Sequence, residues 1–481
     1  MRVLIGLEIH VQLTALSSKL FCPTHSGYRG GNPNTYVCPI CLGLPGTLPV
    51  VNRRAVEYAV AVAKALNCEV SDRVMFVRKH YFYPDLPKNY QITQYDGPGF
   101  TSIARSGYVR IFVDGRTKMV RIRRINIEED PGKIHYVGGI EEAHYSLVDY
   151  NRSGVALLEI VTEPDMDSPK EARIFLDKLI AILEYLGVTE TALEGSFRVD
   201  ANISIEGYGR VEVKNIGSIK DVEKALTYEI VRQRRIIEQG GAVARETRHW
   251  DERKGVTVPL RAKEFEEDYR YFPDPDLPPI TISNDMINMI ASMIPELPDH
   301  RIERFMVQYN LDEYRATVLV LSKWLADFFE EGAKMYSNYK RLADMIITDF
   351  LRWVKELSID PKRLSVKPYD IVRLLELLDK GVLSIKMVKE LMPHVVSGGI
   401  NIDEYIKLVG YTRIDDEQYL EQVALEAVKE NPKAVEDALK NPKAINFLIG
   451  AVMKKTGGRA DPQKTKDILV RVLEKVRNLE E

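Results

Sequence analysis

Apolar and polar residues alternate along the beginning of the chain, which predicts a strand with one buried face. The alternating run, VLIGLEIHVQL, places two sets of side chains on opposite faces: Leu7, Ile9, Val11 and Leu13 on one, and Glu8, His10 and Gln12 on the other. We expect the apolar set in the core. Alternation alone carries no chemistry, so the polar set fits a solvated strand face unless other residues join it.

Up to about Pro295 the chain mixes short strands and Gly/Pro turns with two clear helices. GYVRIFVDGRTKMVRIRRINI holds two β-rich runs around Asp114-Gly115, a typical two-residue hairpin turn. One helix is predicted over 52–66, and a second opens at Ser168-Pro169 and ends at Gly187. Since no regular βαβ rhythm links these elements, the pattern favours an α+β fold over a doubly wound parallel sheet.

Beyond Pro295 the apolar residues recur at helical spacing. The last stretch contains AINFLIGAVMKKTGGRADPQKTKDILVRVLEKV, which predicts two helices joined at Gly457-Gly458, the second starting at Asp461-Pro462. The change of pattern near Pro295 and the start of the last stretch around Val409 predict three domains: residues 1–294, 295–408 and 409–481.

Composition and charge fit a folded chain of several domains. Of 481 residues, 45% are hydrophobic and 28% charged, which is outside the disordered class. A net charge of -3 excludes a globally basic surface, so RNA contacts would need local patches. The N-terminus lacks the unbroken apolar core of a secretory signal, and no apolar run reaches the ~18 residues that cross a bilayer, so we expect a cytoplasmic protein with no membrane segment.

The cysteines are clustered in a way that indicates a metal rather than disulfides. Two pairs with three-residue spacing form the cluster: Cys22 and His25, then Cys38 and Cys41. Three sulfurs and one imidazole would complete a closed tetrahedral Zn²⁺ site, structural because no position remains for water. A water or His10 is the alternative to His25 as fourth ligand, and three unrelated thiols are the alternative to a metal.

Two acidic segments could meet the polar face of the first strand. The strand ending in RRINI runs into Glu128-Glu129-Asp130, and GVALLEIVTEPD places Glu159 and Glu163 four positions apart, which predicts one strand face. Carboxylates from strand ends can hold Mg²⁺, which leaves positions for water and phosphate. Acidic turns are also common in solvated loops, so the residues alone leave this site open.

No familiar nucleotide-binding loop accompanies these carboxylates. The sequence contains no G-x-x-x-x-G-K-[ST], no G-x-G-x-x-G after a strand and no G-x-S-x-G nucleophile elbow. An ATP site would therefore have to be of another design.

Long motifs resemble the B-subunit family of glutamyl/aspartyl-tRNA amidotransferases, in that family's order and over almost the whole chain. They are GLEIHVQL, NPNTYVCPICLGLPGTLPVVNRRAVEYA, RKHYFYPDLPKNYQITQYD, INIEEDPGK, LVDYNRSGVALLEIVTEPD, EGSFRVDANIS, DYRYFPDPDLPP and FLIGAVMKKTGGRADP. The related archaeal E subunit carries an extra inserted domain. The short segment between RYFPDPD and PELPD leaves no room for it, which favours the B type.

The resemblance implies a cradle-shaped domain with a mixed or antiparallel sheet, a helical domain and a small all-α tail of the YqeY type. It also implies a ligase reaction: ATP phosphorylates the side-chain carboxylate of mischarged Glu-tRNA(Gln) or Asp-tRNA(Asn), and ammonia then forms the amide. An amidase A subunit would supply the ammonia and a small C subunit would complete a heterotrimer, because this chain lacks a Gly/Ser-rich amidase signature.

The same resemblance assigns roles to residues of the matching motifs. Mg²⁺ and ATP would be held by Glu8, His10, Glu128 and Glu159, with Glu129 as the ambiguous neighbour. Lys79 joins them as a catalytic residue, and the substrate or ammonia path would be lined by Tyr81, Tyr83, Asn151 and Arg152. Zinc-binding family members usually have C-x-C as the first pair, so here His25 is expected to substitute as ligand.

The tail carries a local basic excess, with nine Lys/Arg against five Asp/Glu from Pro442 onward. Lys454, Lys455 and Arg459 surround Gly457-Gly458, where backbone could approach phosphates. Charge alone fits a solvated helix end equally well; the resemblance favours tRNA.

A non-catalytic, zinc-containing tRNA-binding scaffold is the alternative to an enzyme. The quartet of Glu8, His10, Glu128 and Glu159 separates the two hypotheses, because a scaffold has no use for these residues.

Overall fold

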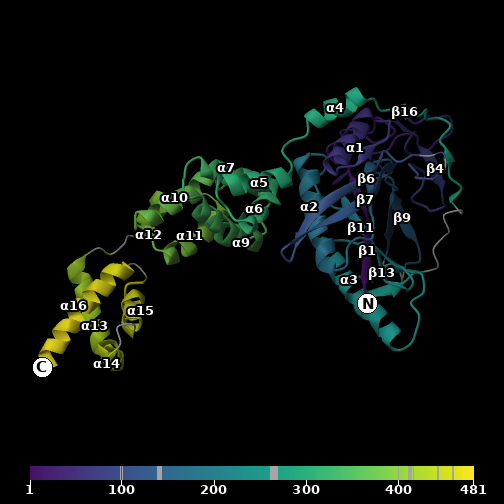
Figure 1. Cartoon of the computed structure of the whole chain (residues 1–481). Helices are drawn as coiled ribbons and strands as arrows, with labels where there is room; N and C mark the ends of the chain where they lie inside the picture. Colours follow the sequence, from purple (N-terminus) through teal and green to yellow (C-terminus); the bar gives the residue numbers. More distant parts are fainter. Residues whose placement is uncertain are drawn as a thin grey trace. The chain divides into compact units, whose positions relative to one another are not determined.

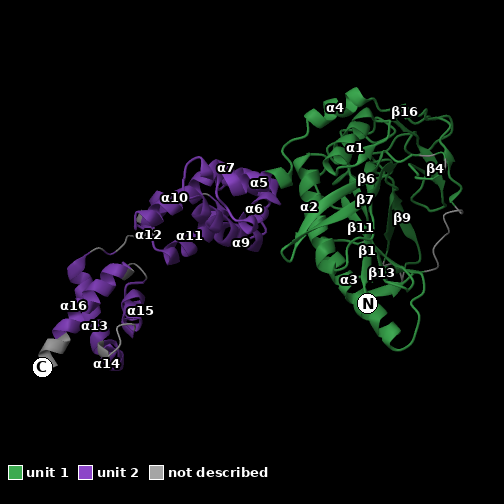
Figure 2. Cartoon of the chain, viewed as in Figure 1, with its two compact units in different colours: residues 1–300 green, residues 301–481 purple. Residues whose placement is uncertain are grey.

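The computed structural model consists of two compact units, residues 1–300 and 301–481 (Figures 1 and 2). It describes residues 1–97, 99, 101–137, 143–260, 269–398, 400–409, 414, 416–440, 444–457 and 460–480. Among these residues, no helix has both the length and the apolar character needed to cross a membrane. The boundary expected at 408/409 stays a prediction.

The first unit is built on a nine-stranded sheet in the order β14-β13-β12-β11-β1-β10-β7-β6-β2. Neighbouring strands pair antiparallel except β12 and β13, which are parallel. The strands are Val3–Gln12 (β1), Glu69–Val70 (β2), Ala104–Val113 (β6), Arg116–Glu129 (β7), Ala156–Thr162 (β10), Phe197–Ile205 (β11), Val211–Ile216 (β12), Glu246–Asp251 (β13) and Val256–Pro259 (β14). The expected α+β fold with a mixed sheet is confirmed.

Three small sheets flank the large one, in the orders β15-β4-β5, β16-β3 and β8-β9. Their strands are Arg73–Val74 (β3), Val77–His80 (β4), Tyr90–Thr93 (β5), Lys133–Tyr136 (β8), Ser146–Asp149 (β9), Phe272–Pro273 (β15) and Ile280–Thr281 (β16). The pairing of β15 with β4 joins segments almost 200 residues apart in the chain, at Phe272 and Arg78.

Helices pack against the large sheet: α1 (Arg53–Ala65) contacts β6 and β7, α2 (Pro169–Tyr185) contacts β6, and α3 (Ile219–Glu238) contacts β11 and β12 (Figure 1). α1 and α2 confirm the two predicted helices. Their caps follow from sequence, since the Asn52 and Ser168 side chains accept hydrogen bonds from the first-turn amides of Arg54 and Glu171.

The central strand β1 shows why the alternation was informative. Leu7, Ile9 and Val11 are at most 1% exposed and belong to the core shared with the helices, each contributing about 1.5–3 kcal/mol of burial free energy. The register of an antiparallel sheet then fixes Glu8 and His10 on the opposite face.

The predicted hairpin is present between β6 and β7, with Asp114 at φ +50° and Gly115 at φ +78°, as a primed two-residue turn requires. The prediction that Glu159 and Glu163 share a strand face is wrong. The register of β10 shifts between Val161 and Thr162, and Glu163 lies beyond the strand, ion-paired with Arg123.

The rest of the described chain is helical, as expected. α4 lies in the first unit, α5 spans the boundary and the later helices form the second unit: Asn284–Ser292 (α4), Pro298–Gln308 (α5), Glu313–Val320 (α6), Lys323–Ala333 (α7), Tyr339–Asp344 (α8), Met345–Phe350 (η2), Leu351–Glu356 (α9), Pro361–Arg363 (η3), Pro368–Asp379 (α10), Ile385–Ser397 (α11), Ile402–Val409 (α12), Glu417–Glu430 (α13), Pro432–Lys440 (α14), Ile445–Lys455 (α15) and Pro462–Glu480 (α16). α15 and α16 are the two helices predicted for the tail, and α13 to α16 share a hydrophobic cluster of their own.

Candidate functional site

The polar face of the large sheet brings together side chains from separate parts of the chain. β1 lies between β10 and β11, so His10 stands opposite Glu159 on one side and Arg198 on the other. β7 is the next strand in the sheet on the other side of β10, and its Asn126 stands opposite Glu159. Directly opposed residues on one face of an antiparallel sheet have Cβ atoms about 5 Å apart, so this strand order makes the convergence.

Glu8, His10 and Glu159 form a compact group whose ligand atoms all lie within 4.8 Å of one another. Glu128 joins through His10, whose Nε2 lies 3.2 Å from Glu128 Oε1 and 3.9 Å from Glu8 Oε1. The structure thus brings together the four residues expected to form the site. Two carboxylates and an imidazole fit a divalent cation, and the carboxylate oxygens suit Mg²⁺.

The charges of these groups favour a protonated His10 when no cation is bound. Burial disfavours the imidazolium, but the hydrogen bond to Glu128 and the charges of Glu128, Glu8 and Glu159 outweigh it and raise the pKa of His10 to about 9. Burial likewise opposes ionisation of Glu128, and the contact with His10 nevertheless keeps the pKa of that carboxyl below its usual range. The carboxylates of Glu8, Glu128 and Glu159 therefore stabilise a positive charge at the position of His10.

Amide and hydroxyl groups orient the carboxylates. Glu128 Oε2 accepts hydrogen bonds from Thr93 Oγ1 at 3.0 Å and Gln91 Nε2 at 3.2 Å. Asn126 Nδ2 donates to Glu159 Oε2 at 2.7 Å. Such partners fix the direction in which a ligand carboxylate presents its oxygens.

Glu129, the ambiguous neighbour, is engaged elsewhere. Its Oε2 lies 2.6 Å from Lys88 Nζ, and its Oε1 accepts a hydrogen bond from Ile92 N at 2.9 Å. Successive residues of β7 alternate between faces, which explains why Glu128 and Glu129 have different partners.

Asp130 anchors an ion network that sequence reasoning missed. It is 1% exposed and accepts hydrogen bonds from Gln12 Nε2 at 2.6 Å and from the Arg198 guanidinium at 2.8 Å. Burial opposes its ionisation, but Arg198 and Arg152 hold the pKa of Asp130 below its usual range. The alternation of polar and apolar residues in FRVDANIS indicates a strand that places Arg198 on its polar face, and this pattern could have identified Arg198 as part of the site.

Arg152 and Asn151, expected to line the substrate path, have structural contacts. Arg152 donates to the carbonyls of Pro131 and Gly132 at 2.9 and 2.6 Å. Asn151 is 1% exposed; its Oδ1 accepts from Tyr36 N and its Nδ2 donates to Asn32 O, both at 2.7 Å. Asn151 thus ties the loop before the cysteine pair to the end of β9.

Lys79, on β4, lies among tyrosines. Its Nζ is 4.8 Å from the Tyr269 ring centroid and 5.7 Å from that of Tyr81, contacts that favour the ammonium form. Tyr271 stacks on Tyr95 at 4.2 Å, and Tyr83 lies 5.8 Å from Tyr81. Sequence reasoning missed Tyr269 and Tyr271, because the β15–β4 pairing that brings them here is long-range.

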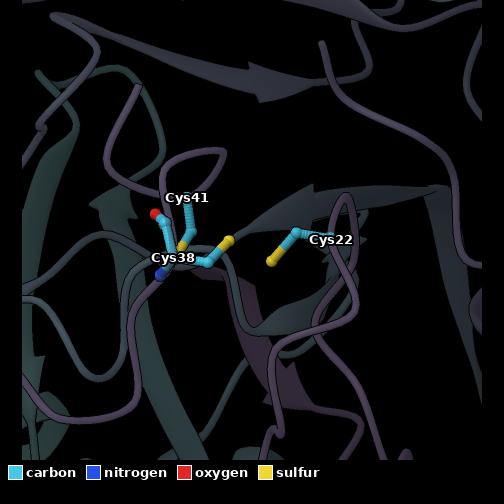
Figure 3. Close-up of side chains that lie close together, drawn as sticks. All are labelled: Cys22, Cys38 and Cys41. Carbon is cyan, nitrogen blue, oxygen red and sulfur yellow. The ribbon is translucent and has the colours of Figure 1, made fainter. Parts of the chain in front are cut away.

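The cysteine pairs converge as predicted, but without His25. The sulfurs of Cys22, Cys38 and Cys41 lie within 4.8 Å of one another (Figure 3). His25 is not part of this group; its Nδ1 accepts a hydrogen bond from Gly27 N at 3.0 Å. Three thiolates are a donor set that suits Zn²⁺, and hydrogen bonding between Cys22 and Cys41 lowers the pKa of Cys41 while raising that of Cys22.

In the tail, Lys454 is exposed near the end of α15. Lys455 forms ion pairs with Glu430 at 2.8 Å and Glu426 at 3.4 Å, so part of its charge is offset. Arg459, the third expected tRNA contact, and Gly458 lie outside the described residues.

Two family models match the chain: the GatB/GatE catalytic domain over residues 3–288 and the GatB domain over residues 327–473. The B subunit of the aspartyl/glutamyl-tRNA(Asn/Gln) amidotransferase from Sulfurisphaera tokodaii is 56% identical over 472 residues, covering 98% of this chain and 99% of the relative. The proteins of the same name from Saccharolobus solfataricus and Thermotoga maritima are 54% and 46% identical with the same coverage. The chain therefore belongs to the family of B subunits of aspartyl/glutamyl-tRNA amidotransferases.

Proposed function

We propose that this chain activates the side-chain carboxylate of mischarged Glu-tRNA(Gln) or Asp-tRNA(Asn) with ATP, and that ammonia then converts the activated group into an amide. The observation that carries the proposal is the convergence of Glu8, His10 and Glu159, backed by Glu128. Family membership supports the amidotransferase reaction, and a cation site of this kind supports a nucleotide-dependent step on this chain.

The chemistry explains why activation is needed. A carboxylate resists ammonia because its leaving group would be oxide. Transfer of the γ-phosphoryl group of ATP gives an acyl phosphate and ADP; ammonia attacks the acyl carbon, phosphate leaves, and the attacking nitrogen loses a proton. A bound Mg²⁺ would offset the repulsion between phosphate and carboxylate.

Each residue of the site has a part in this proposal. Glu8, His10 and Glu159 would hold the cation, and Glu128 orients the His10 imidazole through the contact at Nε2. The Lys79 ammonium lies close to the rings of Tyr81 and Tyr269, contacts that favour its charged form. It would face the anionic groups of the substrates. Tyr81 and Tyr83 would line the path of substrate or ammonia.

We further propose that the ammonia comes from an amidase A subunit in a heterotrimer with a small C subunit, and that Cys22, Cys38 and Cys41 hold a structural Zn²⁺. The donor set supports the zinc proposal. A water or His25, after a side-chain rotation, would supply the fourth ligand.

Reconstitution tests the proposed reaction. The chain is combined with candidate A and C subunits, and labelled Glu-tRNA(Gln) and Asp-tRNA(Asn) are supplied separately. We expect amide formation that requires ATP, Mg²⁺ and this chain, and ammonium chloride should replace glutamine together with the amidase activity. Amide formation at an unchanged rate without ATP would contradict carboxylate phosphorylation.

The tail is proposed to bind tRNA, so truncation before residue 409 should weaken tRNA affinity by about tenfold and flatten its salt dependence, because phosphate contacts release counterions. Filter binding at several salt concentrations measures both effects. Lys454→Ala should lower the affinity more than Lys455→Ala, because Lys455 is already paired with Glu430 and Glu426. Unaltered affinity and salt slope after truncation would place the tRNA site elsewhere.

A further inference from the structure

Lys19 is a lysine buried beside the cysteine cluster. Lys19 is 0% exposed and is among the largest fully buried side chains of the described residues. Its Nζ donates a hydrogen bond to the Tyr36 carbonyl at 2.8 Å and lies 3.6 Å from Cys41 Sγ. A lysine is almost never this buried unless an anion accompanies it.

No described carboxylate forms an ion pair with Lys19. The nearby Glu129 is already paired with Lys88 at 2.6 Å. An isolated buried ammonium would cost several kcal/mol of desolvation. The sulfur of Cys41, which lies 3.6 Å from Lys19 Nζ, is a group that can carry a negative charge.

The backbone of Gly154 lies close to both Lys19 and Cys41. Gly154, at φ +83°, lies against the pair: a Cβ built on it would stand 3.4 Å from Cys41 Cβ, 3.5 Å from Lys19 Cδ and 3.9 Å from Glu129 Oε2. The Gly154 carbonyl accepts a hydrogen bond from Leu20 N at 2.9 Å, which fixes the backbone next to Lys19. Lys19 thus lies beside both Cys41 and the backbone of Gly154.

We propose that Lys19 is the counter-ion of the metal–thiolate cluster and a positioning residue for Cys41. This rests on the zinc proposal above. Three thiolates and a divalent metal leave one negative charge, and the Lys19 ammonium neutralises it. A neutral fourth ligand, a water or the His25 imidazole, then gives an assembly without net charge, so a fourth cysteine is not required.

Cobalt binding to the full chain tests the proposal, with Co²⁺ as a spectroscopic probe. Lys19→Met should lower Co²⁺ affinity by about 10-fold to 100-fold. It should also move the sulfur-to-cobalt charge-transfer band to longer wavelength, because a thiolate without its N–H donor is more electron-rich. Lys19→Arg should retain most of both properties, and Lys220→Met, at an exposed lysine of α3, should change neither. Wild-type affinity and an unshifted band in Lys19→Met would overturn the proposal.

A second measurement decides the matter if Lys19→Met does not fold or if the wild-type chain binds no Co²⁺. In the metal-free chain, Cys41→Ser removes the sulfur that lies 3.6 Å from Lys19 Nζ, whereas Cys38→Ser keeps that contact. The denaturant midpoint of the first unit should therefore be lower for Cys41→Ser than for Cys38→Ser. Equal midpoints would refute the counter-ion role, while absence of Co²⁺ binding with unequal midpoints would refute only the metal.

Discussion

Replacing Glu8 with glutamine should reduce ATP-dependent amidation of mischarged tRNA by on the order of 10²–10³-fold. Glu8, His10 and Glu159 each place one potential ligand atom in the proposed cation site. Glutamine keeps the shape of the side chain but removes the charge that attracts a cation. The side chain is 26% exposed, so the sheet should fold normally.

Single-turnover amidation in the reconstituted complex measures this loss. tRNA binding and the glutaminase activity of the partner should stay unchanged, because neither should depend on the proposed cation site of this chain. Glu206→Gln, at an exposed carboxylate just beyond β11, is the matched control and should amidate at the wild-type rate. Retained amidation in Glu8→Gln, together with normal tRNA binding, would favour the scaffold alternative.

Local patterns predicted those parts of the fold that depend on neighbours in sequence. The alternation of β1, the caps at Asn52 and Ser168 and the turn at Asp114-Gly115 all follow from a few adjacent residues. Glu163 marks the limit of this reasoning. A register shift at the end of β10 breaks the two-residue period, and no local pattern reveals it.

The site required a different kind of information. The convergence of Glu159 on His10 depends on the strand order β7-β10-β1-β11, which periodicity does not determine. The family resemblance named these residues without a geometric reason, and the register supplies one. His25 shows the reverse case: it has the sequence spacing of a ligand, but its Nδ1 accepts a hydrogen bond from Gly27 N instead of joining the sulfurs.

Buried charges were the hardest to predict. Lys19 and Asp130 look in sequence like ordinary surface residues, since charged side chains are usually exposed. Their burial follows from partners contributed by other elements, as when Asp130 meets Arg198 of β11. The polar residues that organise the site therefore become visible only with the tertiary structure.

Cys38→Ser should remove a structural zinc and lower the melting temperature of the first unit by roughly 5 °C or more. Zinc binding to a site of this type is worth about 10–16 kcal/mol in small zinc-finger peptides, but here the first unit has a large hydrophobic core that does not depend on the metal. The loss should therefore loosen the segment around residues 22–51 rather than unfold the unit, and each kcal/mol lost lowers the melting temperature by about 2–4 °C in a unit of this size.

Metal analysis of chain purified without chelators, together with calorimetry, measures both effects. Cys68→Ser is the matched control: Cys68 is also buried, 4% exposed, but lies outside the cluster, so this variant should keep its zinc even if it loses some stability. His25→Ala separates the two candidates for the fourth ligand, since zinc content should fall only if the imidazole binds the metal. Wild-type protein without zinc, or an unchanged melting temperature in Cys38→Ser, would show that the three thiols pack together without a metal.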